Sequence, residues 1–227
     1  MPGIPLSCGK NTTAENLARR GFIVLLPYYM GVCDSRGCFN FSNSVKTALR
    51  GWEFCNSKYF LNYLKDSKEK PLIRKIKWVY SANSFGAIIL LASLKDVKVE
   101  SSLLISPVVP KWFSRENTAS LFKFLKSGYP FTFRTENLLS VYKDFSEKTI
   151  LSKTNFLSQN QKVKKLMIIH GYKDKVVPLK DVKDFFKSLE QSINKVYYFF
   201  VPRGTHKSNT LLNDKVLGKI KRVFYVG

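Results

Sequence analysis

The residues most able to do chemistry lie in three short segments, each directly after a run of apolar residues. Ser84 stands in the segment Ser81–Ala87 (SANSFGA), with Ala82 two residues before it and Gly86 two residues after it. Small residues at these positions are typical of a sharp strand-to-helix turn, because larger side chains would clash with the strained backbone there. The pattern predicts that Ser84 is a nucleophile. The alternative is a serine that only caps the following helix.

An acid and a base follow two later apolar runs. Asp174 lies after Leu166–Ile169, and His206 lies after Val196–Val201 on a glycine-containing loop. A serine nucleophile needs a general base to take its proton and an acid to orient that base. Of the two histidines in the chain, we expect His206 to be the base and His170 to be a packed, hydrogen-bonded residue. The alternative for Asp174 is a turn aspartate that caps the next helix.

The elements that position these residues are predicted to form an α/β fold with a mostly parallel sheet flanked by helices. Apolar runs this short fit strands that are buried on both faces, and their alternation with helices implies right-handed crossovers. The expected strands are Phe22–Leu26, Lys77–Tyr80, Leu103–Ile105, Leu166–Ile169 and Val196–Val201, and the expected helices are Thr13–Arg20, Ser44–Leu64, Phe85–Leu94, Leu179–Leu189 and Leu211–Phe224. The candidate residues then lie at the carboxyl ends of strands, where open α/β sheets place their sites.

We expect the whole chain to form a single domain. Residues 107–165 interrupt the alternation of strands and helices within it. This stretch contains no clear strand and is too long for an ordinary connection, so we expect a cap insertion with its own structure. Its aromatic and cationic centre predicts a cap over a substrate pocket or a surface that meets lipid, and the alternative is a cluster that only packs on the sheet. Four cations of the insertion would favour anionic substrates unless they are merely solvated: Lys111, Lys123, Lys126 and Arg134.

Composition narrows the class of protein. The chain has 227 residues and a net charge of +22, and 44% of its residues are hydrophobic. These values fit one folded domain and argue against intrinsic disorder. The charge suggests nucleic acid or an anionic surface as a partner. The cations are spread over several clusters without a recognition motif, however, so we expect solvated faces and no specific nucleic-acid partner.

The four cysteines all lie in the first quarter of the chain, at Cys8, Cys33, Cys38 and Cys55. They form no CxxC pair and have no nearby histidine, so no metal site is expected. No secretory signal precedes them, and reduced thiols are the expectation, with a disulfide between two of them as the alternative. The apolar runs are far shorter than the ~20 residues that span a bilayer. We therefore expect a cytoplasmic protein with no transmembrane segment.

The chain order Ser84, Asp174, His206 resembles that of the α/β-hydrolase superfamily. The segments around these residues are most similar to its prolyl oligopeptidase-like and small esterase branches. The resemblance implies a serine hydrolase with a catalytic triad that cleaves a carboxylic ester, with a peptide bond as the alternative. It implies a small-molecule ester or short peptide as substrate and no cofactor. A different class remains open, namely a truncated or degenerate hydrolase-fold protein that binds a ligand or partner without catalysis.

The resemblance also extends to the N-terminal region. Residues Pro2–Pro5 are similar to the family's His-Gly-x-Pro turn, with proline in place of the histidine, and this implies an oxyanion hole made by the N–H groups of Ile4 and Phe85. In the family a central strand precedes this turn. The resemblance therefore implies an N-terminally incomplete fold, in which Phe22–Leu26 faces a gap of unpaired backbone. We expect the chain to be a fragment; the alternatives are direct pairing across the gap, or a gap filled by another segment or chain.

Overall fold

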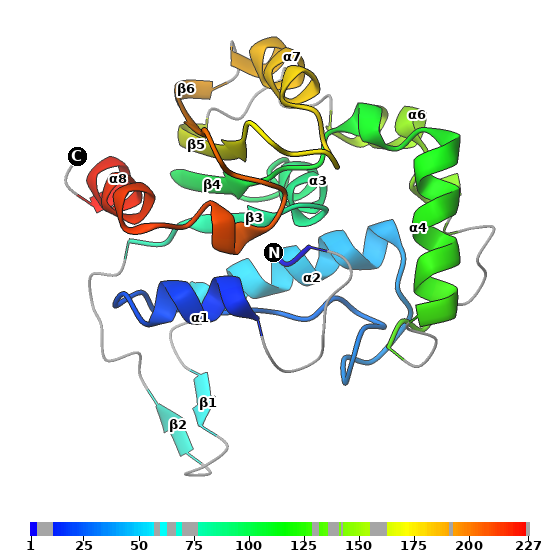
Figure 1. The fold of residues 1–227 in the computed structure, drawn as a ribbon. Helices are drawn as coiled ribbons and strands as arrows, with labels where there is room; N and C mark the ends of the chain where they lie inside the picture. The colour runs from blue at the N-terminus through cyan, green and yellow to red at the C-terminus, as the bar shows by residue number, and fades with distance from the viewer. Residues whose placement is uncertain are drawn as a thin grey trace.

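The computed structural model of the chain describes residues 1–3, 11–56, 60–62, 67–69, 77–128, 132–135, 141, 143–154, 163–190 and 193–225. Within this part the central element is a four-stranded sheet in the order β3-β4-β5-β6, with every neighbouring pair parallel (Figure 1). Its strands are β3 (Tyr80–Asn83), β4 (Ser101–Ile105), β5 (Val163–Gly171) and β6 (Ile193–Val201). The predicted α/β fold with a parallel sheet is confirmed.

Helices flank this sheet, and a small hairpin lies apart from it (Figure 1). The helices of the described part are α1 (Thr12–Ala18), α2 (Phe41–Cys55), α3 (Gly86–Ser93), α4 (Arg115–Gly128), α6 (Glu147–Thr154), α7 (Leu179–Leu189) and α8 (Asp214–Tyr225). Single 3-10 turns occur at Pro110–Trp112 and Ser208–Thr210. The hairpin pairs β1 (Phe60–Asn62) with β2 (Ser67–Glu69) in antiparallel fashion.

The side chains of the sheet alternate between two apolar layers. On one face, Leu104 and Ile168 pack into the cluster that contains α2, α3 and α7. The sequence of α3, GAIILLAS, is apolar throughout, and every residue of this helix is buried. On the other face, Leu103 and Met167 pack against α8, whose buried residues recur at helical spacing: Val216, Leu217, Ile220 and Phe224. The helices α3 and α8 therefore lie on opposite sides of the sheet (Figure 1).

Several predicted elements have different bounds in the structure. The strand expected at Lys77–Tyr80 begins only at Tyr80 and ends at Asn83. The helix expected to reach Leu64 ends at Cys55, because Asn56 terminates it. The Asn56 amide nitrogen Nδ2 donates a hydrogen bond of 2.8 Å to the carbonyl oxygen of Trp52, and asparagine is frequent at helix ends.

The strand predicted at Phe22–Leu26 is wrong. The segment belongs to no sheet of the described part, and Ile23 and Leu25 are 58% and 44% exposed, while Val24 between them is half-buried. A strand needs a partner backbone at a distance of about 4.8 Å. Here a cavity of about 1190 Å³ lies between the segment and β3 instead. β3 is consequently the edge of the sheet as described.

The predicted insertion, residues 107–165, contains α4 and α6, while its last three residues belong to β5. It is attached to the core through aromatic side chains. The ring of Phe145 lies 5.8 Å from that of Phe39 and 5.3 Å from that of Phe85, measured between ring centres. Because Phe85 directly follows Ser84, the insertion packs beside the predicted nucleophile. Its role as a cap stays a prediction.

Cys33 is disulfide-bonded, so the expectation of reduced thiols is wrong at this residue, whereas Cys55 is a free thiol. Disulfides are rare in reducing compartments. The cytoplasmic location, which was expected partly from reduced thiols, stays a prediction.

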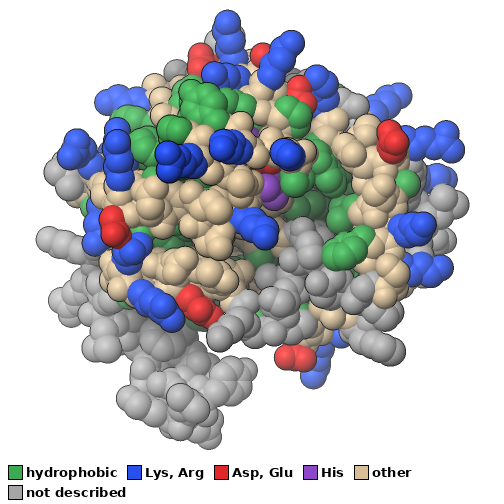
Figure 2. Space-filling model, in the orientation of Figure 1, with side chains coloured by type: hydrophobic (Ala, Val, Ile, Leu, Met, Phe, Trp, Pro, Cys, Tyr) green, Lys and Arg blue, Asp and Glu red, His purple; other side chains and the backbone are tan. Residues whose placement is uncertain are grey.

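Many cations lie on the face of the molecule that Figure 2 shows. Over the described residues of this face, Lys and Arg side chains are spread without a single dominant patch, with few acidic side chains between them. No helix among the described residues is both long enough and apolar enough to cross a bilayer. In the same part of the chain, no three His, Cys, Asp or Glu side chains gather as a metal site would require.

The contact between Gly171 and Gly204 yields a test of how the loops after β5 and β6 are held together. A Cβ added at Gly171 would overlap the carbonyl of Gly204 and lie 2.9 Å from the backbone nitrogen of Thr205. We expect Gly171→Ala to lower the free energy of unfolding by about 1–3 kcal/mol, as overpacking does. Urea unfolding measures this. In the control, Gly218→Ala in α8, the added methyl meets no atom within 4 Å, and stability should rise by up to ~1 kcal/mol. A Gly171→Ala variant as stable as the parent would contradict the close contact.

Candidate active site

Ser84 lies in a backbone conformation that few residues other than glycine adopt. Its φ is +50°, in the left-handed region, at the turn between β3 and α3. Backbone hydrogen bonds hold it there: its N–H donates to Ile105 O at 3.0 Å, and its carbonyl oxygen accepts from Val108 N–H at 3.1 Å and from Ala87 N–H at 3.0 Å. The end of β4 thus holds the turn from the side. Ser84 therefore lies in a strained turn between a strand and a helix.

The two small residues around Ser84, Ala82 and Gly86, leave room for other backbone segments to pack closely against the turn. Ala82 is 1% exposed, and a Cβ added at Gly86 would lie 2.5 Å from the carbonyl oxygen of Met1 and 2.6 Å from that of Pro2. Any side chain at Gly86 would therefore push the N-terminal residues away from the turn. Both positions thus hold residues small enough for the close packing around Ser84.

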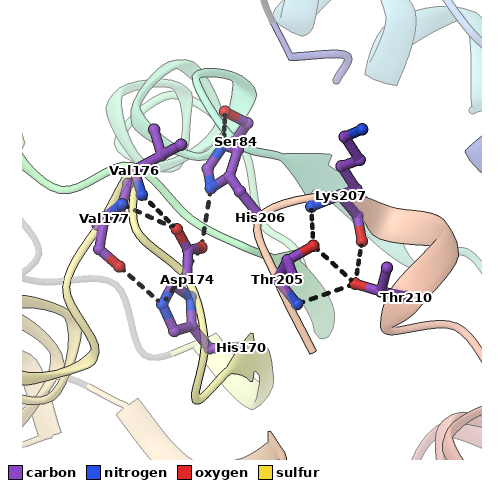
Figure 3. Close-up of polar contacts among 9 residues, drawn as sticks. All are labelled: Ser84, His170, Asp174, Val176, Val177, Thr205, His206, Lys207 and Thr210. Carbon is purple, nitrogen blue, oxygen red and sulfur yellow. Dashed lines mark hydrogen bonds and ion pairs between the residues drawn. The ribbon is translucent and has the colours of Figure 1, made fainter. Parts of the chain in front are cut away.

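A chain of hydrogen bonds links Ser84 to His206 and Asp174 (Figure 3). Ser84 Oγ lies 2.8 Å from His206 Nε2, and His206 Nδ1 lies 2.8 Å from Asp174 Oδ2. Because a carboxylate accepts, Nδ1 carries the proton and donates it to Asp174, which leaves Nε2 to accept from the serine hydroxyl. The three predicted residues come from three different strand ends and meet at one edge of the sheet. This arrangement can move a proton away from the serine oxygen.

The carboxylate of Asp174 is buried and bound from two sides. Its Oδ1 atom accepts the backbone N–H groups of Val176 and Val177, both at 2.9 Å, while Oδ2 faces His206. Burial alone would raise the pKa of Asp174, but the hydrogen bonds from His206 and Val177 outweigh it and hold the pKa below its usual value. Asp174 is therefore ionised at neutral pH.

His170 lies behind the carboxylate, on the side away from the serine (Figure 3). Its side chain is fully buried. The Nε2 atom lies 3.0 Å from the carbonyl oxygen of Val177 and 3.5 Å from Asp174 Oδ2. Nε2 therefore carries a proton and donates to the carbonyl. Burial lowers the pKa of His170, against the pull of the Asp174 carboxylate. His170 is packed and hydrogen-bonded, as expected from its position at the strand end.

The loop that carries His206 is held by its own hydrogen bonds. Thr210 Oγ1 accepts the backbone N–H of Thr205 at 2.9 Å and donates to the carbonyl oxygen of Lys207 at 2.8 Å (Figure 3). Lys173 N–H donates to Gly204 O at 2.9 Å, which joins this loop to the one that carries Asp174. The acid and the imidazole are thus fixed relative to each other.

One predicted oxyanion donor lies inside the described part and the other outside it. The N–H of Phe85 is at the start of α3, where the first N–H groups of a helix have no acceptor within the helix and favour negative charge. Ile4 lies outside the described residues. The preceding Gly3 is close to Ser84, since a Cβ added there would lie 3.0 Å from Ser84 Cβ and 3.6 Å from Ser84 Oγ.

Tyr29 supports this N-terminal turn, and the sequence contained no signal for that role. Its hydroxyl donates to Pro2 O at 2.7 Å, and the side chain is fully buried. Burial raises the pKa of Tyr29 well above its ordinary value, so the hydroxyl stays a hydrogen-bond donor. The same ring packs edge-on against Phe85, with 5.9 Å between ring centres.

Two of the four cationic side chains of the insertion bind to other groups of the protein. Lys111 pairs with Asp181 at 2.7 Å, and the Arg134 guanidinium donates to Cys33 O at 2.8 Å. These two side chains are less available to an anionic substrate than the sequence suggested. Lys123 and Lys126 are exposed on α4.

Comparisons with known proteins bear on the fold. No protein-family sequence model and no curated protein sequence matches the chain. An esterase from Pyrococcus furiosus is similar in structure, with a TM-score of 0.56 and 19% identity over 92% of this chain and 73% of its own. The chain has the α/β-hydrolase fold. The expected resemblance to this superfamily is confirmed at that level.

Two further structures with this fold match most of the chain. Est1E from Butyrivibrio proteoclasticus, solved with ferulic acid bound, has a TM-score of 0.55 and 13% identity over 100% of this chain and 86% of its own. A thermophilic esterase from Thermogutta terrifontis, solved with malate bound, has a TM-score of 0.54 and 14% identity over 97% of this chain and 86% of its own. Identities this low relate these proteins through the fold alone.

The Tyr29 hydroxyl yields a prediction about the turn beside the nucleophile. Tyr29→Phe leaves the carbonyl of Pro2 without its donor in a buried place, which typically costs about 1–3 kcal/mol. We expect a loss of this size in the free energy of unfolding, measured by urea titration. Tyr172→Phe is the control, because Tyr172 is 55% exposed and should change stability by less than about 0.5 kcal/mol. Equal, small effects of both substitutions would contradict a structural role of the Tyr29 hydroxyl.

Proposed function

We propose that the protein is a serine hydrolase that cleaves a carboxylic ester through an acyl-enzyme. The observation that carries this proposal is the 2.8 Å contact between Ser84 Oγ and His206 Nε2 at a residue in the left-handed conformation. Such strain persists where surrounding structure enforces it and is concentrated at functional sites. The α/β-hydrolase fold, which the chain shares with several esterases, also supports the proposal.

In the first half-reaction, Ser84 Oγ attacks the carbonyl carbon of the ester. The serine proton moves to His206 Nε2 as the oxygen–carbon bond forms. When the tetrahedral intermediate collapses, the bond to the alcohol breaks, and the alcohol leaves with the proton from His206. An ester between Ser84 and the acyl group remains.

In the second half-reaction, water attacks the acyl-enzyme. His206 takes a proton from this water, the new carbon–oxygen bond forms, and Ser84 leaves with the proton from Nε2. The products are the carboxylic acid and the free enzyme. The chemistry needs no redox change.

Asp174 and the oxyanion donors act on charge that develops during these steps. The carboxylate of Asp174, kept ionised by its hydrogen bonds, stabilises the imidazolium of His206 and fixes its tautomer. The N–H of Phe85, with that of Ile4 as second donor, stabilises the oxyanion. Removing one such donor typically costs about 3–4 kcal/mol of transition-state stabilisation.

An ester is proposed over a peptide bond because the structural relatives reported above are esterases. Hydrolysis of p-nitrophenyl esters of increasing chain length, measured beside aminoacyl anilides, compares the two substrate classes. Faster cleavage of the anilides would favour a peptidase.

Labelling with a fluorophosphonate tests the nucleophile. In this reaction the Ser84 oxygen–phosphorus bond forms, the phosphorus–fluorine bond breaks, and fluoride leaves while the serine proton goes to His206. We expect one label per chain, located on Ser84 by mass spectrometry. Ser84→Ala should abolish labelling, and His206→Ala should slow it by at least about 100-fold, the lower end of what a general base contributes.

Ser106→Ala is the matched control. Ser106 is also a serine with a left-handed φ, +44°, at the end of the neighbouring strand, and it is fully buried. This variant should be labelled like the parent. Circular dichroism shows whether the parent protein is folded. A folded parent that takes up no label would contradict a serine hydrolase. It would favour a degenerate hydrolase-fold protein that acts by binding.

A further inference from the structure

His170 is a buried titratable residue that the proposed mechanism does not use. It is the last residue but one of β5, and its side chain is fully buried. Burying a polar ring is unfavourable unless its nitrogens find hydrogen-bond partners. An apolar side chain would fill the same space without this requirement. The contacts of the two ring nitrogens therefore show what a histidine contributes here.

The ring of His170 holds the end of the loop that carries Asp174. Its Nε2–H donates to the carbonyl oxygen of Val177 at 3.0 Å. The N–H of the same residue, Val177, donates to Asp174 Oδ1 at 2.9 Å. These two backbone groups lie on either side of one Cα atom, so the two bonds together fix Val177 between the imidazole and the carboxylate. The next residue, Pro178, has no N–H and supplies no donor of its own.

The same nitrogen of His170 also faces the carboxylate (Figure 3). It lies 3.5 Å from Asp174 Oδ2, the oxygen that accepts from His206 Nδ1 at 2.8 Å. The N–H groups around Asp174 are those of Val176 and Val177 at Oδ1, and those of His206 and His170 at Oδ2. A carboxylate has about four acceptor positions. Its orientation is therefore set from all sides, with Oδ2 directed at His206.

His170 makes these contacts without a charge. Its Nδ1 atom is buried and has no hydrogen-bond partner among the described residues, and burial lowers the pKa of the ring. The ring is thus neutral at neutral pH, with its proton on Nε2. The titratable groups that face it are Asp174 and His206. An imidazolium at this place would compete with His206 for the charge of the carboxylate, whereas a neutral donor does not.

We propose that His170 is a positioning residue for Asp174: its Nε2–H holds Val177 and thereby keeps Asp174 Oδ2 directed at His206 Nδ1. Without this donor, the carbonyl of Val177 would be buried and unpaired, and the loop would shift to satisfy it. A misplacement of about 1 Å in an active site can lower the rate by about 100-fold. The effect on turnover rests on the proposed function, whereas the hydrogen bond between Asp174 and His206 exists with or without an ester substrate.

Two substitutions separate the hydrogen bond of His170 from its packing. His170→Phe keeps a ring of similar shape without the donor. His170→Gln keeps a donor, because the glutamine amide nitrogen lies about as far along the side chain as Nε2. The readout is the proton on His206 Nδ1, which NMR detects as a far-downfield resonance and which its loss in Asp174→Ala assigns. We expect His170→Phe to move this resonance upfield and speed its exchange with water, and His170→Gln to retain it.

Turnover of a p-nitrophenyl ester is the second readout. His170→Phe should lower kcat by about 10- to 100-fold and leave KM nearly unchanged, because a fully buried side chain does not contact the substrate. His170→Gln should retain most of the parent's kcat. Ser93→Ala is the matched control. It removes a buried hydroxyl of α3 that donates to Leu90 O at 2.7 Å and to the Tyr80 hydroxyl at 3.2 Å, so it should lower stability and leave the resonance and kcat unchanged.

The NMR readout keeps this proposal separate from the proposed function, because it needs no hydrolysis. An unchanged resonance in folded His170→Phe would overturn the positioning role, even if kcat falls. Equal losses in His170→Phe and His170→Gln would overturn the role of the donor. If His170→Phe does not fold, NMR of isotope-labelled histidine in the parent decides. The proposal requires the His170 proton on Nε2, bonded to the Val177 carbonyl, and a proton on Nδ1 instead would overturn it.

Discussion

The backbone of Ser84 is the constraint on which the rest of the site depends. A φ of +50° is unfavourable for serine, and it persists because Ile105 O, at the end of β4, and Val108 N–H, in the loop after β4, hold the turn. The turn aims Oγ away from the sheet toward His206 and leaves the N–H of Phe85 at a helix start. In the proposed mechanism, both the nucleophile and one oxyanion donor thus follow from a single strained residue. Gly86 contributes by letting Met1 and Pro2 approach from the other side.

The acid and the imidazole reach this turn through a second close contact. Gly171 and Gly204 touch at the ends of β5 and β6, where any side chain would separate the loops. The contact brings Asp174 to within 2.8 Å of His206. His170 and the backbone of Val177 then fill the space behind the carboxylate. The position of His206 relative to Ser84 is therefore set by the parallel strands of the sheet and by the hydrogen bonds of the loops that follow them.

Much of this arrangement was predictable from the sequence, because it depends on local patterns. Ser84 stands out through the small residues at Ala82 and Gly86, and Asp174 and His206 each follow an apolar run that forms a strand of the sheet, buried in β5 and half-buried in β6. Features that depend on tertiary partners were not predictable in the same way. Phe22–Leu26 has the composition of a strand, but a strand needs a paired neighbour, and a cavity lies beside it instead. The hydroxyl of Tyr29 meets Pro2 only in the folded chain, and the disulfide at Cys33 has no spacing signal.

In the proposed mechanism, the strained turn presents Ser84 to both a base and an oxyanion site. A crystal structure of the protein after reaction with a fluorophosphonate tests this most directly. The account predicts continuous density from Ser84 Oγ to phosphorus, with the phosphoryl oxygen within about 3.1 Å of the Phe85 nitrogen and His206 still bonded to Asp174. An adduct on another residue, or one on Ser84 whose phosphoryl oxygen points to solvent and away from Phe85, would contradict it.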